Sequence, residues 1–360
     1  MSMVRFITSF FFLVSLALFF SVYISPEFFP YVGVITLTIP ILLVINAFLF
    51  IALLLSKRKL LILPLIALVI GWKFVGVTIQ FRQDGPQQEG LSVLSYNVHM
   101  FSYSKNGGDR AVAGQNLIKW LKDNPADIKC YQEFYQDPTT PSRNTIKLLG
   151  TETGYHHSLQ IIQGNPKRRA FGMAIFSKYP IVNEGVLIDS KNTNGIMFAD
   201  IKIEKDTIRI YNAHLESMNI PSEELNNLDG IKDNYKVTLR KLKRGQVARA
   251  SQLDILMEHM ENSPYANILV GDFNDVPYSY TYFSLRRKMQ NAFEKAGSGF
   301  GFTYNKVLFF LRIDNIFYDD LFDIKSFKTH KEVDYSDHYP ISAVFTWDKP
   351  LRKYTQEAGD

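Results

Sequence analysis

The sequence contains one cysteine, Cys130, among 360 residues. A single cysteine excludes an intrachain disulfide and a thiolate metal cluster, because each of these needs at least two thiols. Cys130 lies in a strand-like run, 128–134, that is flanked by the apolar residues Ile128 and Phe134. We therefore expect a small buried side chain rather than a nucleophile.

A strong excess of charge of one sign is also missing from most of the chain. The formal net charge is +5, but residues 1–90 hold six Lys or Arg and three Asp or Glu, so the other 270 residues carry only +2. A nearly neutral domain gives no electrostatic argument for nucleic acid as its partner. The one local excess is at 236–249, with six basic residues and no acidic one. A solvated helix face is the simpler explanation, and a phosphate-binding surface is the alternative.

Long apolar runs, in contrast, fill the first 80 residues. A helix needs about 20 mostly apolar residues to cross the roughly 30 Å of bilayer hydrocarbon. Three runs have this length, 6–25, 29–55 and 60–80, although the third contains Lys73. A cleaved signal peptide does not explain the first run, because it lacks a small-residue cleavage site and is followed at once by more apolar sequence. The sequence predicts about three transmembrane helices.

Basic residues in the short loops predict the orientation, because Lys and Arg are retained on the cytoplasmic side of a membrane. Arg5 precedes the first run and Lys-Arg-Lys at 57–59 separates the second from the third, whereas 25–31 has no basic residue. An odd number of spans then delivers the rest of the chain to the outside. We expect a multi-pass protein of the cytoplasmic membrane with an extracytoplasmic domain. A third run that fails to span would place this domain in the cytoplasm.

After the apolar region, the polar stretch QDGPQQEG at 83–90 predicts a short tether. Beyond it, short β-branched or aromatic runs are interspersed with helical patterns, which predicts an α/β domain of two packed sheets flanked by helices. The strand-like runs are 91–97, 128–133, 173–177, 198–203, 208–214, 268–272, 313–318 and 341–347, and the helical ones are 113–123 and 247–261. The predicted organisation is an anchor at 1–82, the tether at 83–90, the globular domain at 91–350 and a tail at 351–360.

Polar residues stand at the carboxyl ends of four strand-like runs: Asn97, Glu133, His214 and Asp272. Side chains from separated segments converge where such strand ends share a rim, so we expect a common site. Six strings, in chain order, hold the candidate residues: LSYNVHMF (Asn97), CYQEFY (Glu133), IYNAHLES (Asn212, His214), LVGDFNDVP (Asp272, Asn274), RIDNIFYD (Arg312, Asp314) and YSDHYP (Ser336, Asp337, His338).

This ordered set resembles the endonuclease/exonuclease/phosphatase family, over about 91–347. The resemblance implies a four-layer α/β sandwich and metal-dependent hydrolysis of a phosphoester. It makes Glu133 the principal metal ligand, with Asn97 and Asp337 nearby. Oxygen ligands of this kind suit Mg²⁺ or Mn²⁺, which would reduce the repulsion between a phosphoester and an attacking hydroxide. The chain departs from the family at His99, where apurinic endonucleases have an aspartate, so no second metal ligand is expected there.

The resemblance also implies catalytic roles. Asp272 and Asn274 would orient the attacking water and hold a phosphoryl oxygen. His338 would pair with Asp314, which favours the charged imidazole, and would act as acid, base or electrostatic clamp. His214 would bind the phosphoryl group from the other side or assist the leaving group. The candidates for substrate binding are Asn212 and Arg312, and Arg312 is equally a candidate salt-bridge partner.

Several alternatives stay open. The anchor and the nearly neutral domain favour a phospholipid headgroup as substrate, and an extracytoplasmic nuclease is the rival within the same class. A binding protein that keeps the fold without activity is a third hypothesis. Residues 218–249 predict an insertion at the rim of the site, whose basic half contacts substrate or lipid headgroups. The expected partners are a phosphoester substrate and the lipid bilayer, and no obligate protein partner is inferred.

Overall fold

The computed structural model describes the chain except for residues 1–2, 83–88, 190–192, 219–227, 307–310 and 352–360. Most of the predicted tether and almost all of the predicted tail therefore lie outside the described residues. The chain divides into two compact units. We call them the helical unit, made of 1–80, 218–251 and 275–287, and the sandwich unit, made of 81–217, 252–274 and 288–360.

Three long apolar stretches of helix begin the helical unit, as predicted. They are Met3–Ser21, Val32–Leu55 and Lys59–Thr78, and each is long and apolar enough to cross a membrane. A polar bridge joins the first two, because the Asn46 side-chain amide donates to Ser15 Oγ at 2.7 Å in a buried position. The helices are α1 (Met3–Ser21), α2 (Val32–Ile35), α3 (Ile39–Leu55) and α4 (Ile62–Thr78).

The one charged residue of α4, Lys73, faces α1. Its ammonium group lies 3.2 Å from the Tyr23 hydroxyl and 3.4 Å from the Phe19 carbonyl oxygen. It also lies 4.8 Å from the centre of the Tyr23 ring. A hydroxyl, a carbonyl and an aromatic face reduce the cost of removing this cation from water. Lys73 is thus compatible with a membrane-spanning α4.

The helical unit also contains most of α8 (Leu228–Glu261) and the short helix α9 (Tyr280–Arg286). Phe283 of α9 packs on the rings of Tyr23 and Phe74, with centroid distances of 5.7 and 5.2 Å. Gln246 of α8 packs so closely on Gly33 that a Cβ added at Gly33 would lie 2.5 Å from it. From residue 228 on, the predicted 218–249 insertion is therefore a helix that packs on the apolar helices.

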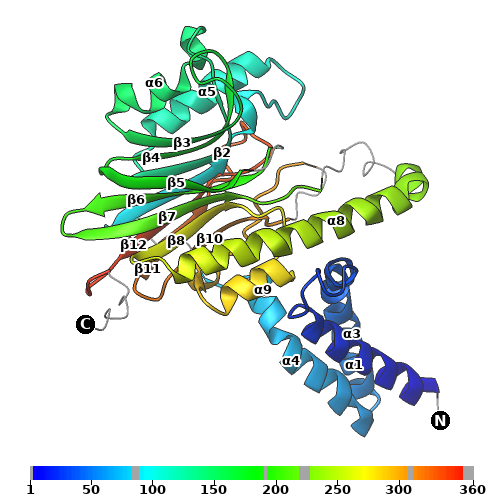
Figure 1. Ribbon diagram of the computed structural model, residues 1–360. Coiled ribbons are helices and arrows are strands. Elements are labelled where there is room, and N and C mark those ends of the chain that lie inside the picture. The colour runs from blue at the N-terminus through cyan, green and yellow to red at the C-terminus, as the bar shows by residue number, and fades with distance from the viewer. Residues whose placement is uncertain (1–2, 83–88, 190–192, 219–227, 307–310, 352–360) are drawn as a thin grey trace. The chain divides into compact units, whose positions relative to one another are not determined.

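The sandwich unit contains two mixed six-stranded sheets, with strand orders β11-β12-β1-β2-β4-β3 and β5-β6-β7-β8-β10-β9 (Figure 1). The first consists of β1 (Leu91–Asn97), β2 (Ile128–Gln136), β3 (His156–Gly164), β4 (Ala170–Ser177), β11 (Asp323–Thr329) and β12 (Ile341–Thr346). The second consists of β5 (Ile181–Asp189), β6 (Gly195–Ile203), β7 (Asp206–His214), β8 (Ala266–Asp272), β9 (Gln290–Asn291) and β10 (Asp314–Tyr318).

Helices complete the layers of the sandwich unit. Residues from the inner faces of both sheets form one apolar core between them. The helices α5 (Arg110–Asp123) and α6 (Thr145–Leu149) cover the outer face of the first sheet (Figure 1). The last part of α8 packs on the second sheet, where His259 Nδ1 lies 2.8 Å from the Tyr211 hydroxyl of β7. The α10 helix (Ala292–Ala296) contacts β10 and β11. The predicted four-layer sandwich is confirmed.

Two parallel strand pairs bring the polar strand ends to a rim of each sheet. β1 pairs with β2 in parallel and is joined to it through α5, and β7 pairs with β8 in parallel and is joined to it through α8. The register places His214 directly beside Asp272. Because β10 runs antiparallel to β8, its first residue, Asp314, is also level with Asp272. The carboxyl ends of β7 and β8 and the amino end of β10 therefore meet at one edge.

The close approach of β7 and β8 depends on Gly271. Its φ is +144°, and an added Cβ would lie 1.9 Å from the Ala213 carbonyl oxygen. We expect Gly271→Ala to destabilise the sandwich unit by about 3 kcal/mol or more, because backbone strain and overpacking add. This corresponds to a fall in melting temperature of about 10 °C, measurable by thermal unfolding of the full chain in detergent. Gly108→Ala is the control, since its new Cβ would meet nothing closer than Ser104 Oγ at 3.6 Å. Equal melting temperatures for both variants would contradict the argument.

Candidate active site

One carboxylate oxygen, Oδ2 of Asp272, is the centre of the site. The Asn97 side-chain amide donates to it at 3.1 Å, and Nε2 of His214 and Nε2 of His338 each lie 3.6 Å from it. All four side chains are buried. The other oxygen of Asp272 accepts a hydrogen bond from the backbone N–H of Asn274 at 2.9 Å. These contacts give the Asp272 carboxylate a defined orientation between two imidazoles.

Glu133 supplies the most open carboxylate at this centre, with a side chain that is 22% exposed. It accepts a hydrogen bond from the Asn97 amide at 3.3 Å. Its φ is +51°, and the pairing of β2 with β4 shifts register between Tyr131 and Phe134. A bulge of this kind redirects a side chain out of the alternation of a strand, and a non-glycine residue at positive φ carries strain. The backbone at Glu133 is thus held in a costly conformation that aims its carboxylate at the site.

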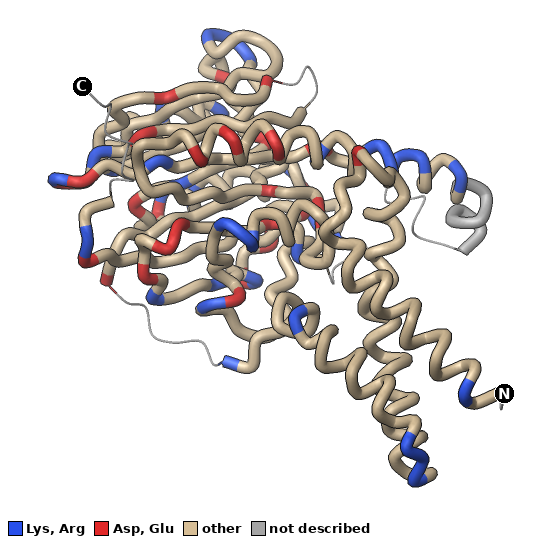
Figure 2. The backbone as a smooth tube through the Cα atoms, turned by 60° about the horizontal axis from the view of Figure 1, so that its bottom comes forward, with Lys and Arg blue, Asp and Glu red and all other residues tan. Residues whose placement is uncertain are grey.

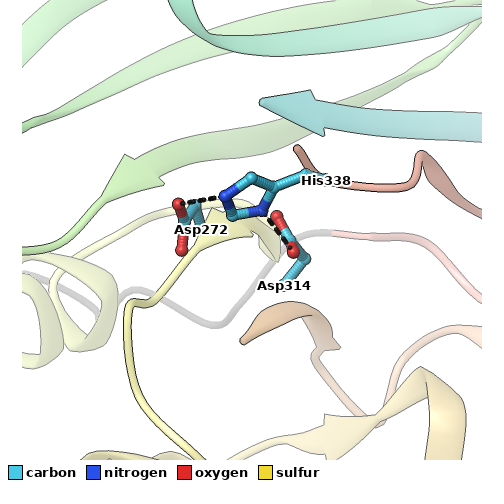
Figure 3. Close-up of side chains that lie close together, drawn as sticks. All are labelled: Asp272, Asp314 and His338. Atoms are coloured by element: carbon cyan, nitrogen blue, oxygen red, sulfur yellow. Dashed lines mark hydrogen bonds and ion pairs between the residues drawn. The ribbon is translucent and has the colours of Figure 1, made fainter. Parts of the chain in front are cut away.

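His338 lies between two carboxylates (Figure 3). Its Nδ1 is 2.9 Å from Asp314 Oδ2, and its Nε2 faces Asp272. Burial by itself lowers the pKa of His338, but the carboxylates of Asp314 and Asp272 raise it more, so that the pKa lies well above the ordinary imidazole value. We infer an imidazolium whose Nδ1–H donates to Asp314 and whose Nε2–H points into the site.

The second histidine, His214, is held differently. Its Nδ1 lies 3.1 Å from the Thr193 carbonyl oxygen. A carbonyl oxygen can only accept a hydrogen bond, so this contact is a hydrogen bond when Nδ1 carries the proton. Nε2 then faces Asp272. Asn274 has a φ of +49°, and its side-chain amide donates to the Leu215 carbonyl oxygen at 3.0 Å. These bonds anchor both residues beside Asp272.

Asp337 lies at the rim of the site, where two basic side chains hold its oxygens. His99 Nδ1 lies 3.2 Å from Oδ1, and Lys306 Nζ lies 2.7 Å from Oδ2. His99 also lies 3.7 Å from a Glu133 oxygen. Burial by itself raises the pKa of Asp337, but His99, His338 and Lys306 together lower it well below the ordinary value. Lys306 was not predicted from the sequence, because it belongs to none of the six strings.

Two further predicted residues bind groups of the core. Asn212 is fully buried, and its amide donates to the carbonyl oxygens of Tyr131 and Ala174 on the other sheet, both at 3.0 Å. The Arg312 guanidinium lies 4.3 Å from the centre of the Phe293 ring and donates to Asn315 Oδ1 at 2.6 Å. Both residues therefore connect structural elements that surround the site.

Two groups of side chains have the composition of a metal site. Asp272, Asp314 and His338 offer ligand atoms within 4.8 Å of one another. In that group, however, both nitrogens of His338 already face carboxylates, so a metal would have to displace the His338 proton. Glu133 and Asp272 instead offer carboxylate oxygens on either side of the Asn97 side-chain amide, which donates to both, and Glu133 is partly exposed. Hard divalent cations such as Mg²⁺ prefer oxygen ligands and retain water, so this second group fits them better.

Models of two protein families match the chain. A model of the endonuclease/exonuclease/phosphatase family matches residues 94–338, and a model of a domain of unknown function (DUF8431) matches residues 1–78. The first match spans more than half of the chain and includes all of the predicted site residues. No curated protein matches the chain.

Solved structures show the same fold. The catalytic domain of human Nocturnin with bound sulfate is 16% identical, with a TM-score of 0.53 over 74% of this chain and 98% of that one. An endonuclease/exonuclease/phosphatase family protein from Bacteroides thetaiotaomicron is 19% identical, with a TM-score of 0.51 over 73% of this chain and all of that one. A mannosyl-6-phosphatase from the same species is 17% identical, with a TM-score of 0.50 over 71% and 100% of the two chains. At these identities the likeness is one of fold.

Proposed function

Because the chain belongs to the endonuclease/exonuclease/phosphatase family, we propose that it hydrolyses a phosphoester bond with a divalent metal ion, Mg²⁺ or Mn²⁺, while its apolar helices hold it in a membrane. Members of this family are phosphoesterases and nucleases, so the chain is a hydrolase. The observation that carries the proposal is the convergence of Asn97, His214 and His338 on one oxygen of Asp272. A buried carboxylate between two imidazoles is suited to moving protons around a phosphoryl group.

In the proposed mechanism Asp272 positions the attacking water and accepts its proton. Hydrogen bonds from the Asn274 backbone and the Asn97 amide hold one oxygen each, which keeps the carboxylate in a single orientation. An oriented base of this kind lowers the barrier by positioning as well as by proton transfer. Asn274 stands next to the water and would contact a phosphoryl oxygen.

His338 supplies positive charge on the opposite side. Asp314 keeps its imidazole protonated, and the Nε2–H would bind a phosphoryl oxygen or donate the proton that the leaving group needs. His214 would bind the phosphoryl group beside it through Nε2. The two histidines approach the same carboxylate oxygen, so a phosphate bound there would contact both.

Glu133, with Asn97 and Asp272 close by, would hold the divalent ion. When bound, such an ion neutralises phosphoryl charge and orients water. Asp337 is placed nearby, but His99 and Lys306 hold its two oxygens. We propose that these two basic side chains supply the positive charge at Asp337, and that one metal ion suffices.

Lys306 would then contact the substrate phosphate at the rim. Lys306→Met is expected to raise KM about tenfold with kcat nearly unchanged. A partly exposed, charge-assisted contact contributes about 1.4 kcal/mol, which corresponds to a factor of about ten. Because the contact is made in both the ground state and the transition state, its loss affects KM and not kcat. Steady-state kinetics test this, with Lys306→Arg as the charge-preserving control. An unchanged KM in Lys306→Met would limit Lys306 to neutralising Asp337.

The side of the membrane follows from charge. Arg5 lies in the first turn of the first apolar helix, and Lys57, Arg58 and Lys59 lie where the second ends and the third begins. We propose that these helix ends are cytoplasmic and that the sandwich unit is outside. A substrate at the outer membrane surface, such as a phospholipid headgroup, would be within reach of a tethered enzyme.

Hydrolysis by the purified full chain in lipid nanodiscs tests the proposal. Bis-p-nitrophenyl phosphate, plasmid DNA and a panel of phospholipids and phosphoinositides would be incubated with Mg²⁺, Mn²⁺ or chelator, with His338→Ala as control. Release of a lipid headgroup that the variant loses would support a lipid phosphoesterase, and DNA cleavage that it loses would support a nuclease. Silence on every substrate with both metals would favour a binding protein.

A further inference from the structure

The first half of α8 carries a basic stripe that the catalytic proposal does not use. We define the α8 basic stripe as Lys236, Arg240, Lys243 and Arg244. At 3.6 residues per turn these four lie within an arc of roughly 100°. Lys236, Arg240 and Arg244 are exposed and Lys243 is partly exposed, and no acidic residue occurs from 234 to 253. Figure 2 shows Lys and Arg, in blue, gathered along the first half of this helix. Arg240, Lys243 and Arg244 therefore have no acidic residue within four positions on the helix to pair with.

Contacts within the helical unit place one end of the stripe beside the loop that joins the first two apolar helices. The Lys243 ammonium lies 4.7 Å from the centre of the Tyr31 ring, and Gln246, one turn further on, packs on Gly33. Tyr31 and Gly33 lie at the start of the second apolar helix, just after the connection from α1. If the apolar helices span a bilayer, this connection lies at its surface. Lys243 is then at headgroup level.

Exposed apolar and aromatic residues flank the stripe. Tyr235, Val237 and Leu239 on α8 are 50%, 44% and 41% exposed, and Phe28 in the connecting loop is 87% exposed. A helix that combines basic residues with exposed apolar and aromatic ones is suited to the interface of a membrane with anionic lipids. A purely solvated face would not need these apolar side chains at the surface.

We propose that residues 235–244 of α8 bind anionic phospholipid headgroups at the surface of the membrane that the three apolar helices cross. The proposal rests on the membrane association and is independent of the chemistry of the active site. The basic side chains match the phosphates in charge, and the apolar ones match the boundary between headgroups and acyl chains. Such binding is electrostatic, so it weakens as salt shortens the screening length.

The single native cysteine makes a site-specific test possible. Cys130 is fully buried, and burial raises the pKa of its thiol, so a cysteine introduced at the surface can be labelled selectively. Val237→Cys in the full chain would carry a fluorophore, in nanodiscs that contain lipids with a quencher in the upper acyl chain. We expect at least twofold stronger quenching with about 30% phosphatidylglycerol than with phosphatidylcholine alone, and loss of the difference at about 0.5 M NaCl.

Two matched controls complete the experiment. Replacement of Lys236, Arg240 and Arg244 by Gln is expected to reduce quenching to the phosphatidylcholine level, whereas exchange of Lys for Arg and Arg for Lys at the same positions keeps it. A label at Val44, which is 69% exposed on α3, reports insertion and should be quenched in every disc and variant. If the Val44 label is quenched while the Val237 label responds neither to phosphatidylglycerol nor to the Gln replacements, the proposal is wrong. The proposal would also be overturned if the fluorescence of the Val237 label responded to a DNA oligonucleotide but not to anionic lipid.

Discussion

Replacement of Glu133 by Gln is expected to lower kcat/KM by about 10³-fold at a fixed Mg²⁺ concentration. Glu133 offers the most open carboxylate of the site, and Asn97 and the strained backbone aim it at Asp272. Loss of a charged ligand removes several kcal/mol of stabilisation of the phosphoryl charge, and about 4 kcal/mol corresponds to this factor. The amide keeps the size of the side chain, so the melting temperature should change little.

Kinetics as a function of Mg²⁺ concentration, together with calorimetric titration of the metal, separate binding from catalysis. Glu133→Gln should require much more Mg²⁺ for half-maximal activity. Glu184→Gln is the control, because it removes an exposed carboxylate from the edge strand β5. Wild-type Mg²⁺ affinity in Glu133→Gln would exclude Glu133 as the metal ligand. Asp272, Asp314 and His338 would then be the candidate ligands.

His338→Gln is expected to lower kcat by about 10³-fold, within the range that a positioned general acid contributes. The partner variant Asp314→Asn gives a second readout, in the pH profile. The carboxylates of Asp314 and Asp272 raise the pKa of His338 against the effect of burial, so the wild-type imidazolium survives well above pH 6.5. Without the Asp314 charge, the alkaline limb of the activity profile should move to lower pH.

The same pair predicts a pH dependence of stability. A histidine whose pKa is raised on folding contributes stability that is fully present below its unfolded value, about 6.5, and is lost as the pH rises through its folded value. The difference in free energy of unfolding between wild type and Asp314→Asn should therefore shrink on the alkaline side. His330→Gln is the control for the stability measurement, because His330 also lies beside a carboxylate: its Nδ1 is 3.2 Å from Glu332 Oε1. An alkaline limb that is identical in wild type and Asp314→Asn would show that the pair does not set the protonation of His338.

The strands that the sequence predicted are the inner ones of each sheet. All eight predicted runs correspond to strands, and the four strands that were not predicted, β3, β5, β9 and β11, are the four sheet edges. An inner strand is buried on both faces and therefore reads as a run of apolar residues, as in β4 and β8, where every residue is buried. Most residues of β5 and β11 are exposed or partly buried, so their apolar pattern is weak. The helix predicted at 247–261 is longer than expected and begins at Leu228. The exposed residues from 235 to 244 show no apolar periodicity, so the sequence did not indicate a helix there.

The sequence by itself determined the three apolar helices, the alternation of strands and helices, and the residue types at the strand ends, because each of these is written in local composition and spacing. Tertiary structure alone decided which atoms meet. The parallel register of β7 with β8 and the antiparallel register of β10 bring His214 and Asp314 level with Asp272, and a bulge turns Glu133 toward them. The pairing of Asp337 with His99 and Lys306 likewise joins segments that are distant in the chain. Hydrogen bonds depend on positions to a few tenths of an ångström, and only the packing of whole sheets sets positions that closely.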